Sequence, residues 1–491
     1  MSMIARSDIP DTVVAIAETL EAGGYESYLV GGCVRDLLIG REPKDWDITT
    51  NARPEQIVAL FPETFQNNAF GTVGVVSETE DERLKVVEIT PYRIESAYSD
   101  SRRPDTVEFS DSLTDDLKRR DFTINALAYS ISRGTTIDEW GGAQDITEKR
   151  IRAVGDAGER FSEDALRMLR AIRLAVELDF IIEAETMTAI AENAHNLSRI
   201  SKERIRDEFI RILNSPVPMQ GILLLEKLGM LEYVAPDILR GIGVDQNQAH
   251  AFTVYEHLLR TLQHAADKDF PFYIRLAALF HDVSKPETRR WSEEKKDWTF
   301  YGHEVVGARV TKKALAALKF PRETVDLVSN LVRWHMFFSD PEAVTLSAVR
   351  RTIQNVGVEH IWDLLNLRIC DRIGTGRPKE QPFRFRKYKA MVEEALRDPI
   401  SVKMLKIDGV RIMEITQEGA GPKLGHTLHA LLEEVLDDPA RNTAEYLEDR
   451  ARALMSMPET ELRTLGEQGK VARETEEGRA VEAIHKKHHV A

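Results

Sequence analysis

Two acidic residues, Asp45 and Asp47, stand one position apart near the N-terminus of this 491-residue chain. They follow the glycine pair Gly31 and Gly32 in an order that predicts a strand, a glycine turn into a helix, and a second strand. Alternate side chains of a strand share a face, so we expect both carboxylates to point one way and Trp46 to point into the core. Adjacent carboxylates repel each other unless a cation neutralises them, and Mg²⁺ binds carboxylates together with substrate phosphates. The pair predicts a magnesium site for phosphoryl or nucleotidyl transfer, the alternative being an ordinary solvent-facing strand.

A third acid, Glu88, lies among valine and isoleucine residues in a strand predicted over residues 85–90. An acid is unexpected between apolar neighbours, so Glu88 is a candidate to join the first two carboxylates. An edge strand that turns this charge toward water is the alternative. Gly71, in the sequence Phe70-Gly71-Thr72, marks either a simple turn or a close approach of the backbone to another group, for example a triphosphate.

The segment from Arg119 to Leu127 is predicted to open a helix. Asp121 and Asn125 are four positions apart and would share one helical face beside Arg120, whose forked donors suit phosphate oxygens. The alternative is a helix start with routine capping residues. An asparagine inside an apolar helix is unfavourable unless its amide bonds to something, which favours a binding role.

Past residue 250, histidine and aspartate residues recur on predicted helices or at their ends. Imidazole and carboxylate ligands contributed by several helices suit a transition metal. A single histidine on an apolar helix face is more often a core residue, but five such positions in this order favour a metal site. The residues are His257, the adjacent pair His281 and Asp282, His303, His335 and Asp371.

The composition is that of a globular protein, with 42% hydrophobic and 30% charged residues. A chain of 491 residues is too long for one core, so we expect two to four domains. Its two cysteines, Cys33 and Cys370, imply neither a disulfide framework nor a zinc ribbon and fit a reducing cytoplasm. No apolar run approaches the length of a membrane span. The net charge of −15 argues against a nonspecific nucleic-acid binder, although basic segments lie at 118–120, 167–173, 202–211 and 384–389.

The predicted elements divide the chain into an α+β part and a helical part. Short strands rich in valine, isoleucine and threonine would form a small mixed sheet, at 27–30, 45–49, 72–76 and 85–90, with helices at 12–22 and 54–61. From about residue 143 the pattern is helical, with Ser162 as a predicted N-cap and further helices at 184–195, 201–213, 219–228, 252–266 and 271–281. We expect a catalytic head at 1–142, a helical neck at 143–245, a metal-binding helical domain at 246–385 and a charged helical tail at 386–491.

Several of these segments together resemble motifs of the nucleotidyltransferase superfamily, and most closely the family of class II tRNA nucleotidyltransferases and bacterial poly(A) polymerases. The resemblance implies a head, a neck and helical body and tail parts, and a third carboxylate beside the metal pair, which Glu88 would supply. Five ordered motifs in roughly the first 240 residues carry it: Gly31-Gly32-Cys33-Val34-Arg35-Asp36, Asp45-Trp46-Asp47, Arg119 to Leu127, Asp138 to Gly155, and Arg160 to Ala171.

The resemblance also implies how the incoming base is chosen. The family's Glu-Asp-x-x-Arg motif corresponds to Glu163, Asp164 and Arg167, and its aspartate and arginine read the Watson–Crick edge of the base in place of a template. Asp164 offers acceptors and Arg167 donors, three positions apart on one helix; from the residues alone the alternative is a simple helix ion pair. Segment 91–109 resembles the flexible loop that CCA-adding members use to change from CTP to ATP, and its arginines are Arg93, Arg102 and Arg103.

Residues 250–375 resemble the HD phosphohydrolase superfamily. The resemblance implies that His257, His281, Asp282 and Asp371 are the core ligands, and that His303 and His335 add a second metal or contact phosphate. One departure is Ser284, which stands where glycine is usual. In CCA-adding enzymes of this kind, the HD domain either hydrolyses cyclic or terminal phosphates on RNA or serves as an RNA-binding body.

These features predict a template-independent nucleotidyltransferase that adds C, C and A to tRNA 3′ ends from CTP and ATP. Asp45 and Asp47 would bind two Mg²⁺ ions, with Glu88 as third catalytic carboxylate, and the HD cluster would bind a transition metal. We expect a cytoplasmic protein with tRNA, ATP and CTP as partners and no membrane association. The alternatives are a poly(A) polymerase and an HD-type metal phosphohydrolase acting on RNA ends. The expected nucleotide-binding residues are Gly31, Gly32, Arg35, Arg120, Asp121, Asn125, Asp164 and Arg167.

Overall fold

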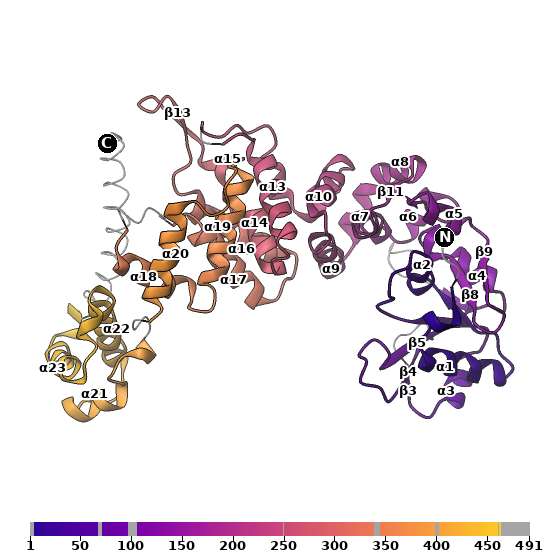
Figure 1. Ribbon diagram of the computed structural model, residues 1–491, viewed down its shortest axis with the longest axis horizontal. Helices are drawn as coiled ribbons and strands as arrows, with labels where there is room; N and C mark the ends of the chain where they lie inside the picture. The colour runs from indigo at the N-terminus through magenta and orange to yellow at the C-terminus, as the bar shows by residue number, and fades with distance from the viewer. Residues whose placement is uncertain are drawn as a thin grey trace. The chain divides into compact units, whose positions relative to one another are not determined.

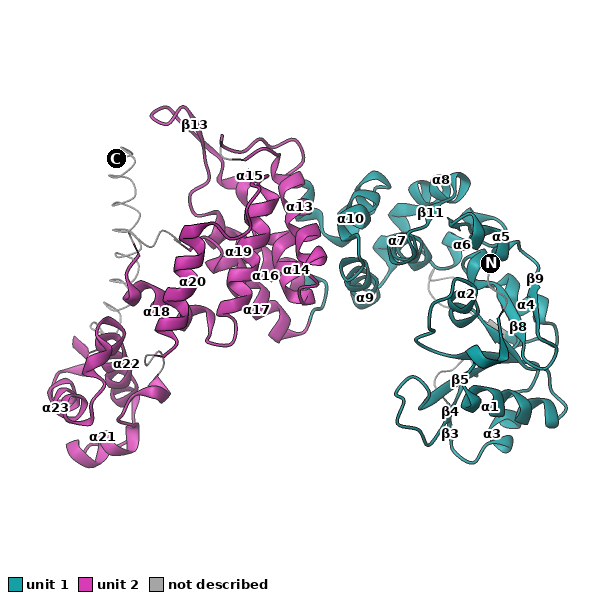
Figure 2. Ribbon diagram, viewed as in Figure 1, with its two compact units in different colours: residues 1–239, 317–320 teal, residues 240–316, 321–491 magenta. Residues whose placement is uncertain are grey.

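The chain divides into two compact units, one of residues 1–239 with 317–320 and one of residues 240–316 with 321–491 (Figure 2). The first unit combines a β-sheet with helices, and the second is mainly helical (Figure 1). This α+β head followed by helical parts is the predicted fold class. No helix in the described part of the chain is long and apolar enough to span a membrane. The computed structural model describes residues 4–66, 71–96, 106–248, 250–337, 344–397, 402–459 and 461–462.

A seven-stranded mixed sheet forms the centre of the head, in the order β3-β4-β5-β2-β1-β8-β9. β2 and β5 are parallel neighbours, and β1 lies antiparallel between β2 and β8. The four strands predicted from sequence all form, with no end shifted by more than two residues. The strands are β1 (Tyr28–Val30), β2 (Asp47–Thr50), β3 (Thr64–Gln66), β4 (Val73–Val76), β5 (Val86–Pro91), β8 (Leu127–Ser130) and β9 (Thr135–Asp138).

Apolar side chains at helical spacing dock the first helices of the head. α1 (Asp11–Ala22) buries Val13, Ile16 and Leu20, which recur every three to four residues. α2 (Gly32–Leu38) follows β1 through the glycine turn, and α3 (Pro54–Leu60) begins with a proline, which suits the first helical turn. A separate hairpin, β6 (Arg93–Ser96) and β7 (Thr106–Phe109), holds the two ends of the segment expected as a flexible loop. Arg102, Arg103 and Phe70 lie outside the described residues.

The helix predicted to begin at Arg119 does not form, and this prediction was wrong. The backbone leaves α4 (Leu113–Lys118), makes one 3₁₀ turn, η2 (Thr123–Asn125), and enters β8. The backbone of this segment pairs with residues near Arg152 instead of forming helical hydrogen bonds. The amide of Thr123 donates to the carbonyl of Arg152 at 2.9 Å, a contact that no local pattern announces.

Helices make up most of the remaining first unit, with one short parallel pair, β10 (Arg150–Ile151) and β11 (Ile181–Ile182). Ser162 is not an N-cap as predicted: it lies inside α6 (Ala157–Glu163), whose N-cap carboxylate, Asp156, accepts the amide of Glu159 at 2.8 Å. The helix ends at Asp164, whose backbone is extended, before the next helix begins. The other helices are α5 (Gly142–Thr147), α7 (Leu166–Leu178), α8 (Ala184–Asn193), α9 (Lys202–Leu213), α10 (Pro218–Lys227), α11 (Leu231–Val234) and α12 (Pro236–Leu239), with the 3₁₀ helix η3 (Ala194–Arg199).

Four helices form the core of the second unit, with α14 and α19 packed against each of the others: α13 (Val254–Asp267), α14 (Phe272–Phe280), α17 (Arg322–Trp334) and α19 (Ile361–Gly374). α14 is apolar on nearly all sides, as a central helix must be. Thr253 and Glu256 form a capping box that fixes the start of α13. Around this core lie α15 (Lys285–Thr288), α16 (His303–Ala317), α18 (Leu346–Val356), α20 (Phe383–Ala395) and a hairpin that the sequence did not predict, β12 (Arg290–Ser292) with β13 (Asp297–Thr299).

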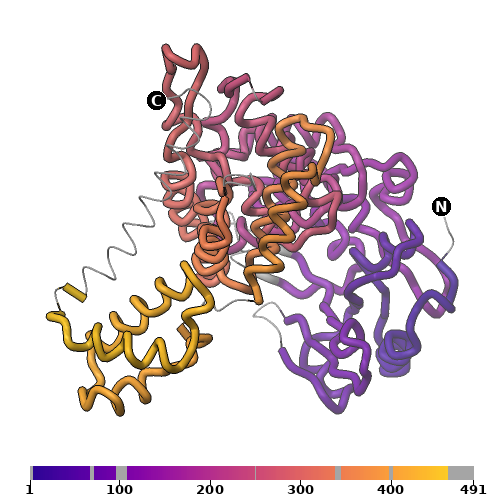
Figure 3. The backbone as a smooth tube through the Cα atoms, turned by 60° about the vertical axis from the view of Figure 1, so that its left-hand side comes forward, coloured from indigo at the N-terminus to yellow at the C-terminus, as the bar shows by residue number. Residues whose placement is uncertain are grey.

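Three helices near the C-terminus pack on one another, drawn in yellow and orange in Figure 3: α21 (Gly409–Thr416), α22 (Pro422–Asp437) and α23 (Ala444–Met455). One 3₁₀ turn, η4 (Val402–Met404), precedes α21, and another, η5 (Pro439–Arg441), follows α22. Arg350 of α18 donates to the carbonyl of Leu436 at 2.8 Å and so ties these helices to the rest of the unit.

Candidate active sites

The carboxylates of the head lie at one end of the parallel strand pair. Asp47 opens β2 and is in register with Glu88 of β5, so their side chains point to the same face of the sheet. Asp45 lies two residues earlier in a bend rather than on the strand as predicted, and its side chain is exposed. Trp46 between them is buried, so the predicted alternation holds. Asp47 and Glu88 thus lie on neighbouring strands as predicted, and Asp45 lies just before them.

The electrostatics of this acid group favour a cation. Burial, followed by the charges of Asp45 and Glu88, raises the pKa of Asp47 to about 6, against the opposing effect of Arg120. A raised carboxyl pKa means that negative charge is crowded at this position. Oxygen ligands in such surroundings are what Mg²⁺ requires, and the residues therefore fit a divalent cation.

The glycine turn brings basic and acidic side chains together above the sheet. Gly31 has φ +80°, a left-handed conformation that favours glycine, and it joins β1 to α2. A Cβ atom at Gly31 would lie 3.0 Å from a guanidinium nitrogen of Arg120 and 3.9 Å from a carboxylate oxygen of Asp47. Gly32 opens α2, and a Cβ atom there would lie 3.6 Å from the Arg35 guanidinium. The left-handed backbone favours glycine at position 31, and Arg120 lies over this turn, close to Asp47.

A buried carboxylate that sequence analysis missed holds this arginine in place. Asp116 of α4 is fully buried and accepts from Arg120 at 3.1 Å and from Arg119 at 2.9 Å. Although burial acts to raise it, the pKa of Asp116 lies below its ordinary value because of these two guanidinium groups. The Nε atom of Arg120 is buried without a hydrogen-bond partner among the described residues. The signal was present in the sequence as an acid three and four positions before two arginines.

Arg35 and Asp121 belong to a second polar chain beside the acid group. Arg35 donates to Asn125 Oδ1 at 2.6 Å and to Asp36 at 2.8 Å. The Asn125 amide in turn donates to Asp121 Oδ1 at 3.0 Å, so these two residues, predicted to share a helical face, meet without the predicted helix. Asp121 also accepts from Arg170 at 2.8 Å, and this guanidinium holds the pKa of the buried Asp121 below its ordinary value.

Asp164 and Arg167 do not bond to each other through their side chains in the described contacts. Asp164 accepts from Arg204 of α9 at 2.6 Å, and Arg167 donates to Glu163 at 2.6 Å. Arg167 also donates to the carbonyl of Arg119 at 3.0 Å, so the neck helix α7 is tied to the head at the acid group. The alternative of a simple ion pair between Asp164 and Arg167 is therefore wrong, because each side chain pairs with a different residue. Arg204 was missed because its partner lies 40 positions away.

Gly71 has φ +84°, and a Cβ atom there would lie 3.0 Å from both Phe109 and Pro54. The described structure accounts for the close backbone approach by these two side chains. Arg93, the described arginine of the expected loop, opens strand β6.

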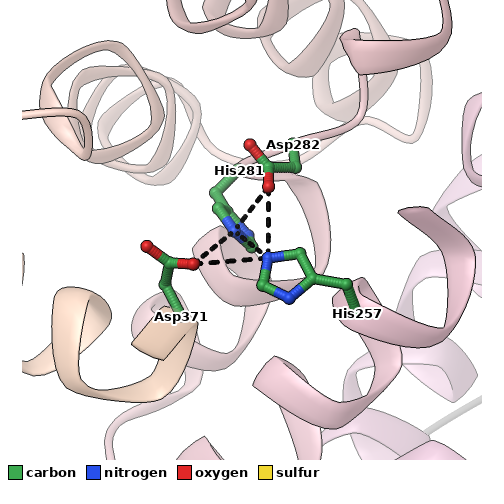
Figure 4. A group of neighbouring side chains, drawn as sticks. All are labelled: His257, His281, Asp282 and Asp371. Atoms are coloured by element: carbon green, nitrogen blue, oxygen red, sulfur yellow. Dashed lines mark hydrogen bonds and ion pairs between the residues drawn. The ribbon is translucent and has the colours of Figure 1, made fainter. Parts of the chain in front are cut away.

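In the second unit, four predicted ligands converge from three helices (Figure 4). His257 lies on α13, His281 and Asp282 follow α14, and Asp371 lies near the end of α19. His257 Nε2 lies 3.0 Å from His281 Nε2, 3.1 Å from Asp282 Oδ2 and 3.3 Å from Asp371 Oδ1. All four residues are buried.

The other two predicted histidines join this group through Asp282. His303 Nε2 and His335 Nε2 lie 3.3 Å apart, at 3.1 Å and 3.4 Å from Asp282 Oδ1. One oxygen of Asp282 thus faces the first histidine pair and the other oxygen faces the second. We call the six residues the HD cluster: His257, His281, Asp282, His303, His335 and Asp371. A carboxylate that bridges two ligand sets is the arrangement expected for two neighbouring metal positions.

Backbone contacts orient these imidazoles. The Nδ1 atoms of His281, His303 and His335 lie 2.8, 2.6 and 2.6 Å from backbone carbonyls three residues earlier, which fixes the proton on Nδ1 and directs the Nε2 lone pairs inward. Two facing lone pairs repel each other unless a cation or a proton lies between them. The Asp282 and Asp371 carboxylates raise the pKa of His281 to about 10 although burial acts to lower it. His281 therefore favours positive charge, whereas burial lowers the pKa of His335 to about 4; the donor set of the HD cluster fits a transition metal.

Lys285 is a further functional candidate that sequence analysis missed. Its ammonium is buried, 2.6 Å from Asp282 Oδ2 and 2.7 Å from Gln246 Oε1. Ser284, the departure from the expected glycine, has φ −98°, which any residue adopts without strain. The serine is therefore compatible with an intact HD cluster.

Comparisons with known proteins agree with this geometry. Family models match three segments: the Poly A polymerase head domain at 27–152, the probable RNA and SrmB-binding site of polymerase A at 179–241, and the HD domain at 254–372. The CCA-adding enzyme of Geobacillus stearothermophilus is 32% identical over 437 residues, covering 88% of this chain and 94% of that protein. The CCA-adding enzyme of Lactococcus lactis is 48% identical over 225 residues, covering 45% of this chain and 55% of that protein.

A solved structure matches along most of the chain. The Bacillus stearothermophilus CCA-adding enzyme in complex with CTP has a TM-score of 0.64 and 29% identity, covering 90% of this chain and 98% of that one. This chain therefore belongs to the CCA-adding enzyme family.

Proposed function

We propose that the head adds C, C and A to the 3′ end of tRNA from CTP and ATP without a nucleic-acid template. Membership of the CCA-adding family supports the activity. The observation that carries the site assignment is the register of Asp47 with Glu88 beside the Gly31 turn, with Arg120 over that turn. The proposed parts are a head at 1–142, a neck at 143–245, an HD domain at 246–385 and a charged tail at 386–491.

The acid group would hold Mg²⁺ through Asp45, Asp47 and Glu88. A bound divalent cation lowers the pKa of the terminal RNA hydroxyl and neutralises charge on the leaving pyrophosphate. In the reaction the 3′ oxygen bonds to the α-phosphorus of the nucleotide, the bond from that phosphorus to the bridging oxygen breaks, and the hydroxyl proton passes to solvent. The raised pKa of Asp47 would return to the ordinary range once positive charge lies beside it.

Arg120 and Arg35 would hold the triphosphate. Arg120 is fixed by Asp116, and its guanidinium lies at the turn beside Asp47, where phosphate oxygens must come. Arg35 is fixed by Asn125, which Asp121 braces. Guanidinium groups held in this way bind phosphate without a large loss of side-chain freedom.

Asp164 and Arg167 would read the base, with Arg204 as a positioning residue. An acceptor and a donor at fixed positions can match the edge of cytosine or adenine. Arg204 holds the Asp164 carboxylate, while Glu163 and the Arg119 carbonyl hold Arg167. The hydrogen bond from Arg167 to the carbonyl of Arg119 joins the base-reading residues to the segment that carries Arg120.

The test supplies purified full-length protein with tRNA that lacks CCA and offers CTP, ATP or both. We expect addition of two C residues from CTP and a single A once both nucleotides are present. Long runs of A from ATP alone would overturn the proposal in favour of a poly(A) polymerase. Absence of incorporation from either nucleotide would overturn both.

A second function follows from the facing Nε2 pairs of the HD cluster. We propose that the cluster binds a transition metal and hydrolyses phosphoesters: a water oxygen bonds to phosphorus, the bond from phosphorus to a ribose oxygen breaks, and that oxygen takes a proton. Lys285, beside Asp282, would contact the substrate phosphate. Metal analysis of protein purified without chelator tests this; no transition metal and no hydrolysis of a 2′,3′-cyclic nucleotide with added Mn²⁺ would overturn it.

A further inference from the structure

Glu208 is a buried acid of the neck that has no part in the chemistry described so far. It lies on α9 one helical turn after Arg204, so the two side chains share a face of that helix. Both of its carboxylate oxygens accept from the guanidinium of Arg173 on α7, at 3.0 and 2.9 Å. Because Arg173 is buried as well, this contact fixes the Glu208 carboxylate in one position.

The guanidinium of Arg170 lies between Glu208 and the residues proposed to hold the triphosphate. Its Nε atom is 3.8 Å from Glu208 Oε1, and its Nη1 atom donates to Asp121 at 2.8 Å. Asp121 accepts from the amide of Asn125, and the oxygen of that amide accepts from Arg35. A chain of ion pairs and hydrogen bonds therefore runs from α9 through α7 to Arg35.

The base-reading carboxylate is linked to the same helix and to the same arginine. Arg204 of α9 donates to Asp164 at 2.6 Å. Although its partial burial acts to lower the pKa of Arg170, the acids around it, first Asp121 and also Asp164, raise that pKa above its ordinary value. The charge of Asp164 therefore acts on Arg170. When a base donates to Asp164, this carboxylate attracts Arg170 less, and Arg170 binds Asp121 more firmly.

We propose that Glu208 and Arg170 are positioning residues that couple recognition of the base to binding of the triphosphate. A base held at Asp164 strengthens the binding of phosphates at Arg35, and bound phosphates strengthen the binding of the base by the same factor. A nucleotide whose base does not match Asp164 therefore also loses affinity for its phosphates. This inference rests on the nucleotide-binding site proposed above.

The test measures this coupling on full-length protein in Mg²⁺ with two parts of CTP, cytidine for the base and inorganic pyrophosphate for the phosphates. In wild type we expect saturating cytidine to tighten pyrophosphate binding by at least about 5-fold. Glu208→Gln keeps the size of the side chain and removes its charge. In this variant the factor should fall to about 1, whereas the affinity for pyrophosphate alone should stay within about two-fold of wild type. KM for CTP should rise by about 5-fold with kcat little changed.

A second variant and a matched control accompany Glu208→Gln. Arg170→Lys keeps the charge, but one ammonium cannot contact acids on both sides, so the coupling factor should fall below about two-fold. Glu177→Gln is the control, because Glu177 contacts Arg173 at 3.6 Å and Arg211 at 3.2 Å. Glu177 thus belongs to the same group of charges, but it does not contact Arg170 among the described residues. This control should change neither the coupling factor nor KM.

Three results would overturn the inference. These are no coupling in wild type, a coupling factor in folded Glu208→Gln or Arg170→Lys equal to that of wild type, and an equal loss of pyrophosphate affinity with and without cytidine. The last result would mean that Glu208 only supports the packing of α9 against α7. Two further variants test the site itself: Arg35→Ala should weaken pyrophosphate binding, and Asp164→Asn should weaken cytidine binding. If neither does, the proposed nucleotide site is wrong; if both do and Glu208→Gln keeps the coupling, only the coupling is wrong.

Discussion

The head and the HD cluster differ in ligand type and in exposure. The head gathers three carboxylates, of which Asp45 is exposed and Asp47 and Glu88 are partly buried. The HD cluster gathers four imidazoles and two carboxylates, all buried. An open carboxylate set binds a hard ion that arrives with nucleotide phosphates, whereas a closed imidazole set retains a softer ion. With the metals proposed above, one chain would separate an exchangeable metal site from a resident one.

Local chain geometry also differs between the two regions. The head acids come from neighbouring strands, so strand register alone brings them together. The HD ligands come from helices separated by up to about a hundred residues, so their meeting depends on helix packing. We therefore expect the two sites to fail independently when single ligands are removed.

The largest expected effect is loss of nucleotide incorporation by the head while hydrolysis at the HD cluster is kept. Replacing Asp45 or Asp47 with alanine should lower nucleotide incorporation by more than about 1000-fold, because charge in the transition state loses its cation. Hydrolysis of 2′,3′-cyclic AMP by the same variants should be unchanged. Both rates are measured on one preparation, and retention of tRNA extension by either variant would refute the head assignment.

The opposite result, loss of hydrolysis with nucleotide addition kept, is expected when ligands of the HD cluster are replaced. Asp371→Asn or His257→Gln should lower cyclic AMP hydrolysis by at least about 100-fold and reduce the content of bound transition metal. Addition of CCA should stay within about two-fold of wild type. Circular dichroism establishes whether each variant is folded. A folded variant with full metal content and full hydrolysis would contradict the ligand set.

Features set by residues close in sequence could be predicted, whereas features set by residues far apart in sequence could not. Alternation placed Asp47 and Glu88 on strands and the carboxylates opposite Trp46, because a period of two is a local property. The segment at Arg119 was misjudged because the carbonyl of Arg152, 29 positions from Thr123, competes for its backbone. The hairpin β12–β13 was also missed, although its pairing is local, with Ser292 opposite Asp297.

The residues that hold the sites were harder to find than the sites themselves. The HD ligands stood out by residue type, but Lys285 is one lysine among many and only burial beside Asp282 distinguishes it. Arg204 pairs with Asp164 across the contact between α9 and α7. Asp116 alone carried a local signal, through its spacing to Arg119 and Arg120. Supporting partners are set by tertiary packing, which a single sequence encodes only indirectly.

A smaller effect sharpens the electrostatic side of the comparison. The pKa of Asp47 is about 6 in the folded head and near 3.8 in an unfolded chain, so its charge opposes folding of metal-free protein. The neutral Asp47 side chain does not oppose folding, so its favourable contribution to the free energy of unfolding is fully present below about pH 4. That contribution is lost as the pH rises through about 6 and the side chain becomes charged. Asp47→Asn should therefore stabilise the metal-free protein at pH 7 by up to about 3 kcal/mol, from two units at 1.36 kcal/mol each, while abolishing incorporation.

Urea unfolding with chelator, from pH 4 to 8, measures this prediction. The difference between wild type and Asp47→Asn should vanish at low pH, where both side chains are neutral. Asp111→Asn is a suitable control, because Asp111 is an exposed carboxylate of the same unit that pairs with Arg53 at 2.8 Å. A wild type more stable than the Asp47 variant at pH 7 without metal would contradict the crowding of charge at the acid group.

The smallest expected effect tests whether the base-reading residues depend on a positioning residue. Arg204→Ala removes the side-chain partner of Asp164 and leaves its carboxylate held only by the amide of Leu166 at 3.1 Å among the described contacts, so KM for CTP and ATP should rise by roughly 5- to 10-fold with kcat little changed. Misincorporation of UTP should rise as well, because selection depends on a fixed acceptor. Arg204→Lys should restore part of the selectivity, since an ammonium can still contact Asp164. Arg211→Ala, on the same helix and paired with Glu177, is the control and should change neither value. A general loss of kcat with unchanged selectivity would mean that Arg204 only supports the packing of α9 against α7, and base reading would then need other residues.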